Sequence, residues 1–129
     1  MAPAHKLIRH GRLLLCYASV EGPFGTHDGT LLVDTGSNYT VVSVEVLERI
    51  GCSPAASREH VRILTGSGVL VAPRVQATAL TIFSWRIDAA YLIAHDLPFS
   101  GPIDGLLGMD VLTALRTRLN IANAEIEMG

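Results

Sequence analysis

Apolar residues recur at every second position over much of the chain, which is the spacing typical of β-strands. Between Val69 and Ile93 the odd-numbered positions are mostly apolar, and we expect turns near Ser84 and at either Gly68 or Pro73. Pro73 lacks a backbone N–H, so it belongs at a sheet edge or at a bulge. The pattern therefore predicts a chain built mainly from β-strands.

Turn residues divide the N-terminal third of the chain. The segment 12–20 is apolar enough for a first strand, and residues 30–33 form a second, shorter apolar run. Asp28-Gly29 lies between the two and indicates a hairpin turn. Residues 1–11 are polar and mixed, and we expect either a loose arm or an edge strand there.

A first short helix is expected over residues 44–50, after a strand at 38–42. Ser43 is a candidate N-cap and Gly51 a candidate C-terminal cap. The apolar residues between them recur at helical spacing and form one stripe. We therefore expect this helix to pack one face against the sheet.

The C-terminal third is expected to begin with a loop at residues 95–102, followed by a short buried strand at 106–107. Asp110 is a candidate N-cap for a second helix that reaches residue 116. Residues 119–128 alternate weakly between apolar and polar, which predicts a last strand.

Composition limits the possible functions. A length of 129 residues suits one domain with its own core, and we expect a single domain over residues 1–129. Because aromatic residues make up only 5% of the chain, that core must consist mainly of Leu, Val, Ile and Ala.

The formal net charge of -2 gives no electrostatic reason to bind nucleic acid or an anionic membrane. Cys16 and Cys52 suggest neither a disulfide framework nor a metal site, and Cys16 is expected to be a buried thiol.

Basic residues precede the apolar run 13–18, and this arrangement faintly resembles a secretory signal. A strand explains the run equally well, and the strand is favoured. No run approaches the ~18 apolar residues of a membrane-spanning helix. For the compartment, the cytoplasm is favoured over the periplasm or a membrane tether within a longer chain.

The candidate chemistry lies at the end of the second expected strand. Leu31-Leu32-Val33 runs straight into Asp34, and the chain must then turn at Thr35-Gly36. A carboxylate carried to the end of a buried strand is costly unless it is hydrogen-bonded or shared. Thr35 offers a hydroxyl, and Gly36 lets the backbone approach the carboxyl closely. This placement indicates chemistry rather than packing.

The segment Asp34-Thr35-Gly36-Ser37 after an apolar strand resembles the active-site motif of the aspartic proteases. Retroviral-type members of that family carry, further along the chain, an apolar pair followed by Gly and a short helix. Leu106-Leu107-Gly108 matches this second element, and Gly66-Ser67-Gly68 matches the tip of the family's flap. The resemblance covers residues 31–115.

Three departures from the retroviral pattern are visible. They are a longer N-terminal segment, the helix expected at 44–50 and a longer stretch between the flap and Leu106. The chain is therefore more similar to the cellular or bacterial retropepsin-like domains.

The resemblance implies an all-β, retropepsin-like closed β-barrel half that pairs with a second copy across a two-fold axis. It implies that Asp34 is the catalytic acid and base, that Thr35 locks the two motif loops together, and that Gly36 permits close approach to the carboxyls. It implies a homodimer that hydrolyses a peptide or protein substrate, with neither a metal nor a cofactor. The implied substrate-binding residues are Leu32, Ser37, Asn38, Gly66, Ser67, Gly68, Leu106 and Leu107.

Other interpretations remain beside the protease. Asp34 could cap a turn, although the position of Leu106-Leu107-Gly108 favours catalysis, and residues 66–68 could form an ordinary hairpin turn. A phosphate loop is disfavoured because that glycine-rich segment has no Lys and no helical pattern after it. The five histidines have no metal-ligand spacing and are expected at the surface. The alternative function is a retropepsin-like dimerisation or peptide-binding domain with little or no turnover.

Overall fold

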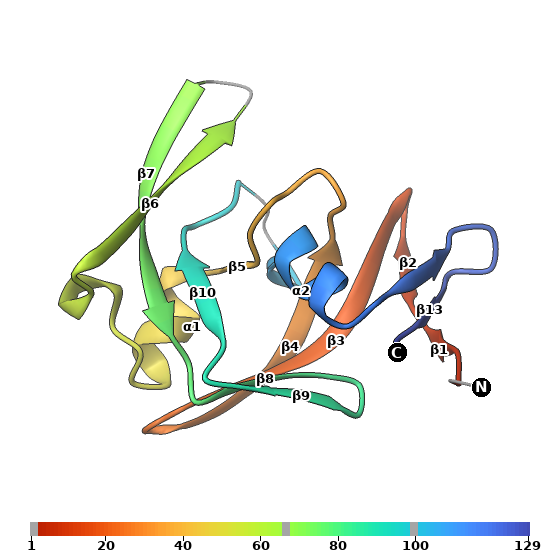
Figure 1. Cartoon of the computed structure of the whole chain (residues 1–129), viewed down its shortest axis with the longest axis horizontal. Helices are drawn as coiled ribbons and strands as arrows, with labels where there is room; N and C mark the ends of the chain where they lie inside the picture. The colour runs from red at the N-terminus through yellow and green to blue at the C-terminus, as the bar shows by residue number, and fades with distance from the viewer. Residues whose placement is uncertain (1–2, 66–67, 99–100) are drawn as a thin grey trace.

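The computed structural model describes residues 3–65, 68–98 and 101–129. Within these residues the chain consists mostly of β-strands, with two short α-helices and one 3₁₀ helix (Figure 1). The N-terminal strands are β1 (His5–Lys6), β2 (Ile8–His10), β3 (Leu13–Gly22), β4 (Gly25–Val33) and β5 (Val41–Val42). The helices are α1 (Val44–Arg49), η1 (Pro54–Ala56) and α2 (Met109–Ala114). The remaining strands are β6 (Glu59–Thr65), β7 (Gly68–Gln76), β8 (Ala79–Ile82), β9 (Trp85–Asp88), β10 (Tyr91–Ala94), β11 (Ile103–Leu107), β12 (Arg118–Asn120) and β13 (Glu125–Glu127).

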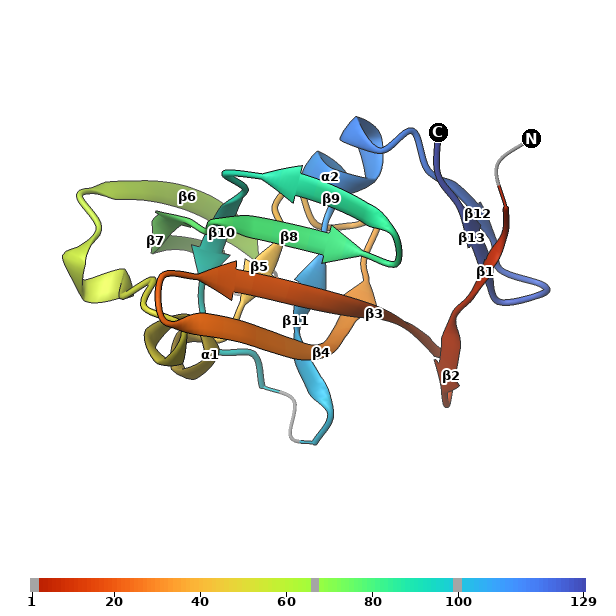
Figure 2. The same cartoon turned by 90° about the horizontal axis from the view of Figure 1, so that it is seen from below.

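Ten of these strands belong to one curled sheet. Its order is β6-β7-β10-β5-β11-β4-β3-β8-β9, and β2 pairs with β3 beside this path (Figure 2). A smaller sheet, β1-β13-β12, joins the two ends of the chain, which lie close together in Figure 1. The mainly-β half-barrel expected from the sequence is confirmed. Residues 5–10 form strands, so the edge-strand interpretation of the N-terminal segment is the right one.

Three strands meet where β4 ends. β11 runs parallel to β4, with Leu107 opposite Val33, and antiparallel to β5, with Leu106 opposite Val41. The strands pass so closely that a Cβ on Gly105 would lie 1.9 Å from the carbonyl oxygen of Val41. Only glycine allows this approach, and the expected short strand at 106–107 is confirmed as part of β11.

The hairpin turn expected at Asp28-Gly29 is wrong. Both residues lie inside β4, opposite Ser19 and Ala18 of β3, and the chain reverses at Pro23-Phe24 instead. Gly29 serves a different purpose, because a Cβ there would lie 1.9 Å from Oδ2 of Asp104. Glycine is favoured both in turns and where another part of the chain packs closely, so the residue type alone does not distinguish the two cases. The close contact here is with Asp104, which lies far from Gly29 in the sequence.

The first helix is confirmed. Ser43 is the N-cap of α1, and its hydroxyl accepts a hydrogen bond of 3.4 Å from the backbone N–H of Val46. Gly51 follows the helix with a left-handed φ of 87°. Of the expected apolar stripe, Leu47 and Ile50 are buried and Val44 packs partly buried against the core. Val46, which lies outside that stripe, is buried as well.

Two expectations in the C-terminal third are wrong. The N-cap of α2 is Gly108 rather than Asp110, and the helix ends at Ala114 rather than at residue 116. The segment 119–128 is not one strand, because it divides into β12 and β13, which pair as an antiparallel hairpin. The turn between them includes Ala124 at a φ of 51°.

Pro73 lies inside β7, and the chain does not turn there. At this residue β7 pairs only with β6, because its pairing with β10 begins at Arg74. Pro73 therefore sits at a local edge, where a missing N–H costs little. The other expected turn, near Ser84, is confirmed between β8 and β9.

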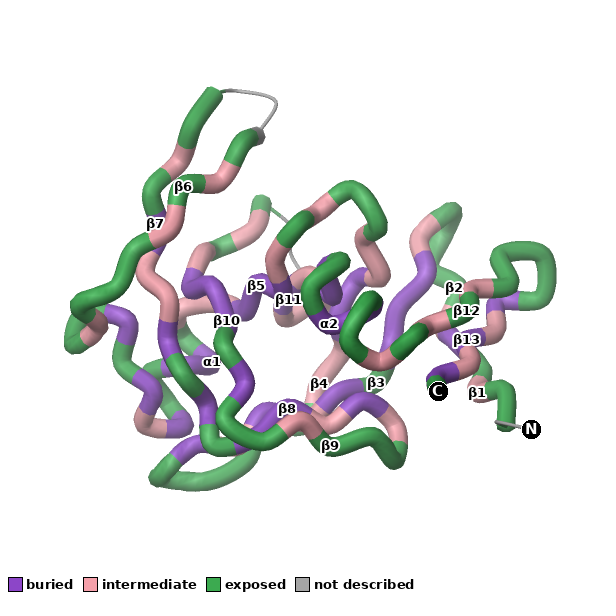
Figure 3. The backbone as a smooth tube through the Cα atoms, viewed as in Figure 1, coloured by how far each residue is buried: buried purple, intermediate pink, exposed green. Residues whose placement is uncertain are grey.

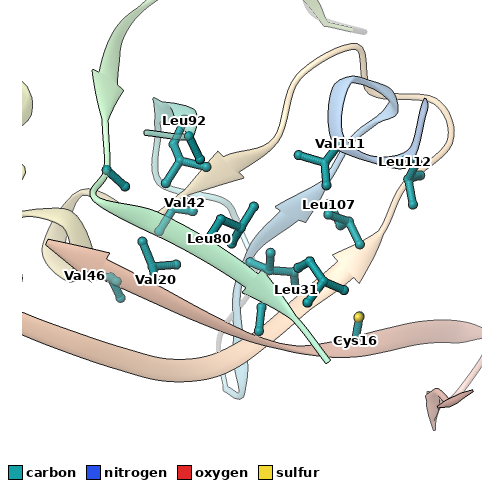
Figure 4. Packing of buried hydrophobic residues seen from close by; sticks show 14 of the residues in the cluster. Cys16, Val20, Leu31, Val42, Val46, Leu80, Leu92, Leu107, Val111 and Leu112 are labelled. Carbon is teal, nitrogen blue, oxygen red and sulfur yellow. The ribbon is translucent and has the colours of Figure 1, made fainter. Parts of the chain in front are cut away.

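The core consists of aliphatic side chains from both sides of the curled sheet. Figure 3 shows the buried positions along the backbone, and Figure 4 shows Leu31, Leu80, Leu92 and Leu107 converging inside. Cys16 has no exposed surface, and this burial raises the pKa of its thiol to about 12. The expected buried thiol is confirmed.

No helix in the described parts of the chain has the length and apolar character needed to cross a membrane.

The packing of the core can be tested by replacing one buried leucine and one exposed leucine with alanine. Leu80 is completely buried, whereas Leu64 is 83% exposed. We expect Leu80→Ala to lower the free energy of unfolding by about 2–5 kcal/mol through lost burial and a cavity, and Leu64→Ala to change it by less than about 0.5 kcal/mol. Urea unfolding at one fixed protein concentration measures both, and equal losses would contradict the packing described here.

Candidate active site

Asp34 follows β4 directly and is held by the backbone around it. Its N–H donates to the carbonyl of Leu107 at 3.0 Å, which continues the pairing of β4 with β11. Its carboxylate oxygen Oδ1 accepts the N–H of Gly36 at 2.9 Å, and its carbonyl accepts the N–H of Ser37 at 3.2 Å. The side chain is half-buried, so the tight turn orients a carboxylate that solvent still reaches.

A hydrogen-bond network centred on the buried Thr40 fixes the loop that carries this turn. Thr40 has no exposed surface, and its hydroxyl donates to Oδ1 of Asp110 at 2.7 Å. The same hydroxyl accepts the N–H of Gly108 at 3.0 Å, and the Thr40 N–H donates to Oδ2 of Asp110 at 3.1 Å. Thr40 thus uses a donor and an acceptor to connect the loop to the start of α2.

Two backbone hydrogen bonds reinforce the same connection. The N–H of Met109 donates to the carbonyl of Ser37 at 2.8 Å, and the N–H of Asp110 donates to the carbonyl of Asn38 at 3.1 Å. The first N–H groups of a helix have no partner within the helix, so the loop satisfies them here. The loop and α2 consequently form one unit.

A groove opens beside Asp34. Its volume is about 310 Å³, and one wall comes from the loop after β4 while the other comes from β6. In Figure 1 the β6–β7 hairpin rises on the same side of the sheet as this loop. The lining residues are Asp34, Gly36, Ser37, Asn38, Tyr39, Arg62, Ile63, Leu64 and Leu106.

The structure brings together five of the residues expected at the site: Asp34, Gly36, Ser37, Asn38 and Leu106. Leu32 and Leu107 do not line the groove; both are buried, and Leu107 belongs to the main core (Figure 4). Gly66 and Ser67 lie outside the described residues, and Gly68 begins β7.

Thr35 is exposed and lies beside a second groove rather than in the first. This groove has a volume of about 340 Å³ and is formed largely by α2 and the segment after it. Its other lining residues are Met109, Leu112, Thr113, Arg116, Thr117 and Leu119. Thr35 therefore points toward a different surface from the one that Asp34 faces.

Sequence analysis missed two groups of residues at the site. Thr40 and Asp110 position the loop, and the available signal was a Thr inside an apolar run with an Asp directly after Leu106-Leu107-Gly108-Met109. Arg62, Ile63 and Leu64 form a wall of the groove. The family resemblance involves the glycines of residues 66–68, and nothing in it indicates that the strand before them lines the groove.

The histidines and acidic residues form no recognisable metal centre. In the ranges 3–65, 68–98 and 101–129, no three side chains of His, Cys, Asp or Glu gather as metal ligands would. The five histidines were expected at the surface: His10 and His60 are exposed, whereas His5, His27 and His95 are half-buried. Nε2 of His27 lies 3.4 Å from Oδ2 of Asp104.

The chain was compared with known families and structures. The family model described as "Aspartyl protease" matches residues 18–111. The crystal structure of a retropepsin-like aspartic protease from Rickettsia conorii matches with a TM-score of 0.73 and 16% sequence identity, covering 98% of this chain and 91% of that one. A curated relative, DNA damage-inducible protein 1 of Yarrowia lipolytica, is 26% identical over 104 residues. The match covers 80% of this chain but spans only 25% of that relative's length.

The network beneath the loop can be tested through its hydroxyl. Thr40→Val keeps the shape but leaves the N–H of Gly108 without its partner and removes one of the two hydrogen bonds that Oδ1 of Asp110 accepts. We expect a loss of about 2–3 kcal/mol in the free energy of unfolding. Thr26→Val, at an exposed position in β4, is the matched control and should change it by less than about 0.5 kcal/mol. Thermal or urea unfolding gives both values, and a Thr40→Val chain as stable as the control would refute the role of this network.

Proposed function

Because the chain belongs to the aspartyl protease family, we propose that it is an endopeptidase whose catalytic pair is one Asp34 from each of two identical subunits. The observation that carries this proposal is the Asp34 carboxylate, which accepts the N–H of Gly36 at 2.9 Å and lines a groove whose other wall is the strand β6. The groove supplies room for a peptide, and the carboxylate supplies the acid–base group.

Hydrolysis of a peptide bond by water needs a base to take a proton from the water and an acid to polarise the carbonyl. Two adjacent carboxyls perform both tasks when they share one proton, since close approach opposes ionisation of both. In the proposed reaction, the ionised Asp34 accepts the water proton while the neutral Asp34 hydrogen-bonds the carbonyl oxygen. The proton taken from water then reaches the leaving amine.

A second carboxyl of this kind is not offered by the neighbouring acidic residues. Asp104 accepts the N–H of Thr30 at 3.1 Å, and Asp110 is engaged by Thr40. Asp28 accepts the hydroxyl of Ser19 in the middle of the sheet. A two-fold axis beside Asp34 solves this problem, because it pairs a residue near the axis with its own copy.

The surface around Thr35 suits contact with the second copy. Thr35 is exposed, and the groove beside it is lined largely by apolar atoms of α2. Met109 is 39% exposed there although it is a large apolar residue. In the proposed dimer, the Thr35 residues approach each other across the axis and this apolar surface is covered.

The substrate is proposed to bind in an extended form between the loop and β6. Ser37 and Asn38 offer polar groups on one wall, and Leu106 offers an apolar contact on the floor. Alternate side chains of an extended peptide point to opposite sides, so successive ones meet different walls. The hairpin of β6 and β7 is the proposed flap, and its closure excludes water.

The acid–base role predicts the effect of one substitution. Asp34→Asn preserves shape but cannot act as the base, so kcat should fall by about 100-fold or more. Asp88→Asn, at an exposed carboxylate on β9, is the control and should retain full activity. The measurement is cleavage of an unbiased peptide library from acid to neutral pH, with and without a pepstatin-type inhibitor.

Two results would contradict this proposal. If the wild-type chain and Asp34→Asn are equally inactive at every pH, the fold serves dimerisation or peptide binding instead. If sedimentation shows a strict monomer that still cleaves peptides, the shared catalytic pair is wrong.

A further inference from the structure

We propose that Arg62 makes this site select peptides that carry an acidic side chain, two positions from an apolar one. This inference rests on the proposed function, since it concerns the substrate of the same groove. It adds a specificity-determining residue on β6, a strand that the catalytic motif does not include.

Arg62 is a cation without a partner on the wall of the groove. Its side chain is exposed, and in the described part of the chain this guanidinium forms neither an ion pair nor a side-chain hydrogen bond, while the backbone of Arg62 pairs with Val71 of β7. Arg74 on the adjoining β7 differs, because its Nε lies 2.9 Å from Oε2 of Glu59 and its guanidinium lies 3.9 Å from the ring centre of Tyr91. The guanidinium N–H groups of Arg62 are therefore available to a ligand, whereas the guanidinium of Arg74 is already engaged.

Among the described residues that line the groove, Asp34 has the one other charged side chain. Asp34 accepts the N–H of Gly36 and is assigned to the chemistry, so it does not neutralise Arg62. The other lining residues are uncharged. A carboxylate brought by the substrate would match the planar fork of the guanidinium, and exclusion of water by the bound peptide would strengthen the pair.

The alternation of side chains along β6 also predicts the spacing between the acidic and the apolar side chain of the substrate. Val61 and Ile63 pack against the small apolar cluster of Val41, Ala72 and Ile93, and Ile63 also lines the groove. Alternation along β6 places Arg62 and Leu64 on the same face of the strand. Leu64 is 83% exposed and lines the groove together with Arg62. Residues two apart in a strand are separated by about 7 Å, in β6 and in an extended substrate alike. An acidic side chain at Arg62 therefore places an apolar one, two positions along the peptide, at Leu64.

The test compares peptides that differ only by Glu or Gln at the proposed position, with an apolar residue two positions away. For the wild-type chain we expect kcat/KM to be about tenfold higher for the Glu peptide, and the ratio to fall as salt is added. Arg62→Gln should bring the ratio close to one, and Arg62→Glu should favour a Lys peptide. Arg58→Glu is the matched control, because Arg58 is exposed just before β6 and does not line the groove; its ratio should equal that of the wild type.

Binding of the same fluorescent peptides to the Asp34→Asn chain separates this inference from the proposed function. A Glu preference in binding that Arg62→Gln abolishes supports the inference even if no variant cleaves. Cleavage without a Glu preference, or with a preference that Arg62→Gln leaves intact, overturns the inference while the protease proposal stands. Neither cleavage nor binding of either peptide overturns both.

Discussion

The position of the Asp34 carboxylate depends on a crossing of three strands. β4 ends at Asp34, β11 runs beside it in parallel, and β5 returns against β11 so closely that position 105 has no room for a Cβ. Thr40 connects the loop after β4 to the start of α2 through its hydrogen bonds to Asp110 and Gly108. Buried polar groups are costly when unpaired, so a fully paired Thr40 favours one arrangement of the loop over its alternatives.

This crossing also places two different surfaces on either side of one loop. The loop presents Asp34 to a groove on one side and Thr35 to an apolar surface on the other. In the proposed mechanism, a single chain provides only one carboxyl of the catalytic pair and leaves this apolar surface uncovered. The proposed two-fold axis meets both needs at once, which makes assembly and catalysis one event.

Local signals in the sequence were sufficient for the motif, for α1 and for the short strand that contains Leu106. In each case the determining residues are neighbours: an apolar run ending in Asp-Thr-Gly, a helix between Ser43 and Gly51, and an apolar pair before Gly108. The family resemblance added the β-barrel half as the fold around them. These parts of the fold were predictable because they depend on contacts close in sequence.

The errors involve contacts between residues far apart in the chain. Gly29 resembles a turn residue until Asp104 is seen against it, and Asp110 resembles a helix cap until its carboxylate is seen on Thr40. Arg62 belongs to a strand whose pattern says nothing of what it faces, and only the hairpin's position places it in the groove. Side-chain roles that arise from such packing are not encoded in any short segment.

In the proposed mechanism two chains build one catalytic site, and mixed dimers test this most directly. Wild-type chains are combined with increasing amounts of Asp34→Asn chains, allowed to exchange, and assayed for peptide cleavage. If each site needs one Asp34 from each subunit, the activity per wild-type chain falls in proportion to the wild-type share, to about half in an equal mixture. Activity per wild-type chain that stays constant at every ratio would contradict the claim, because each chain would then act alone.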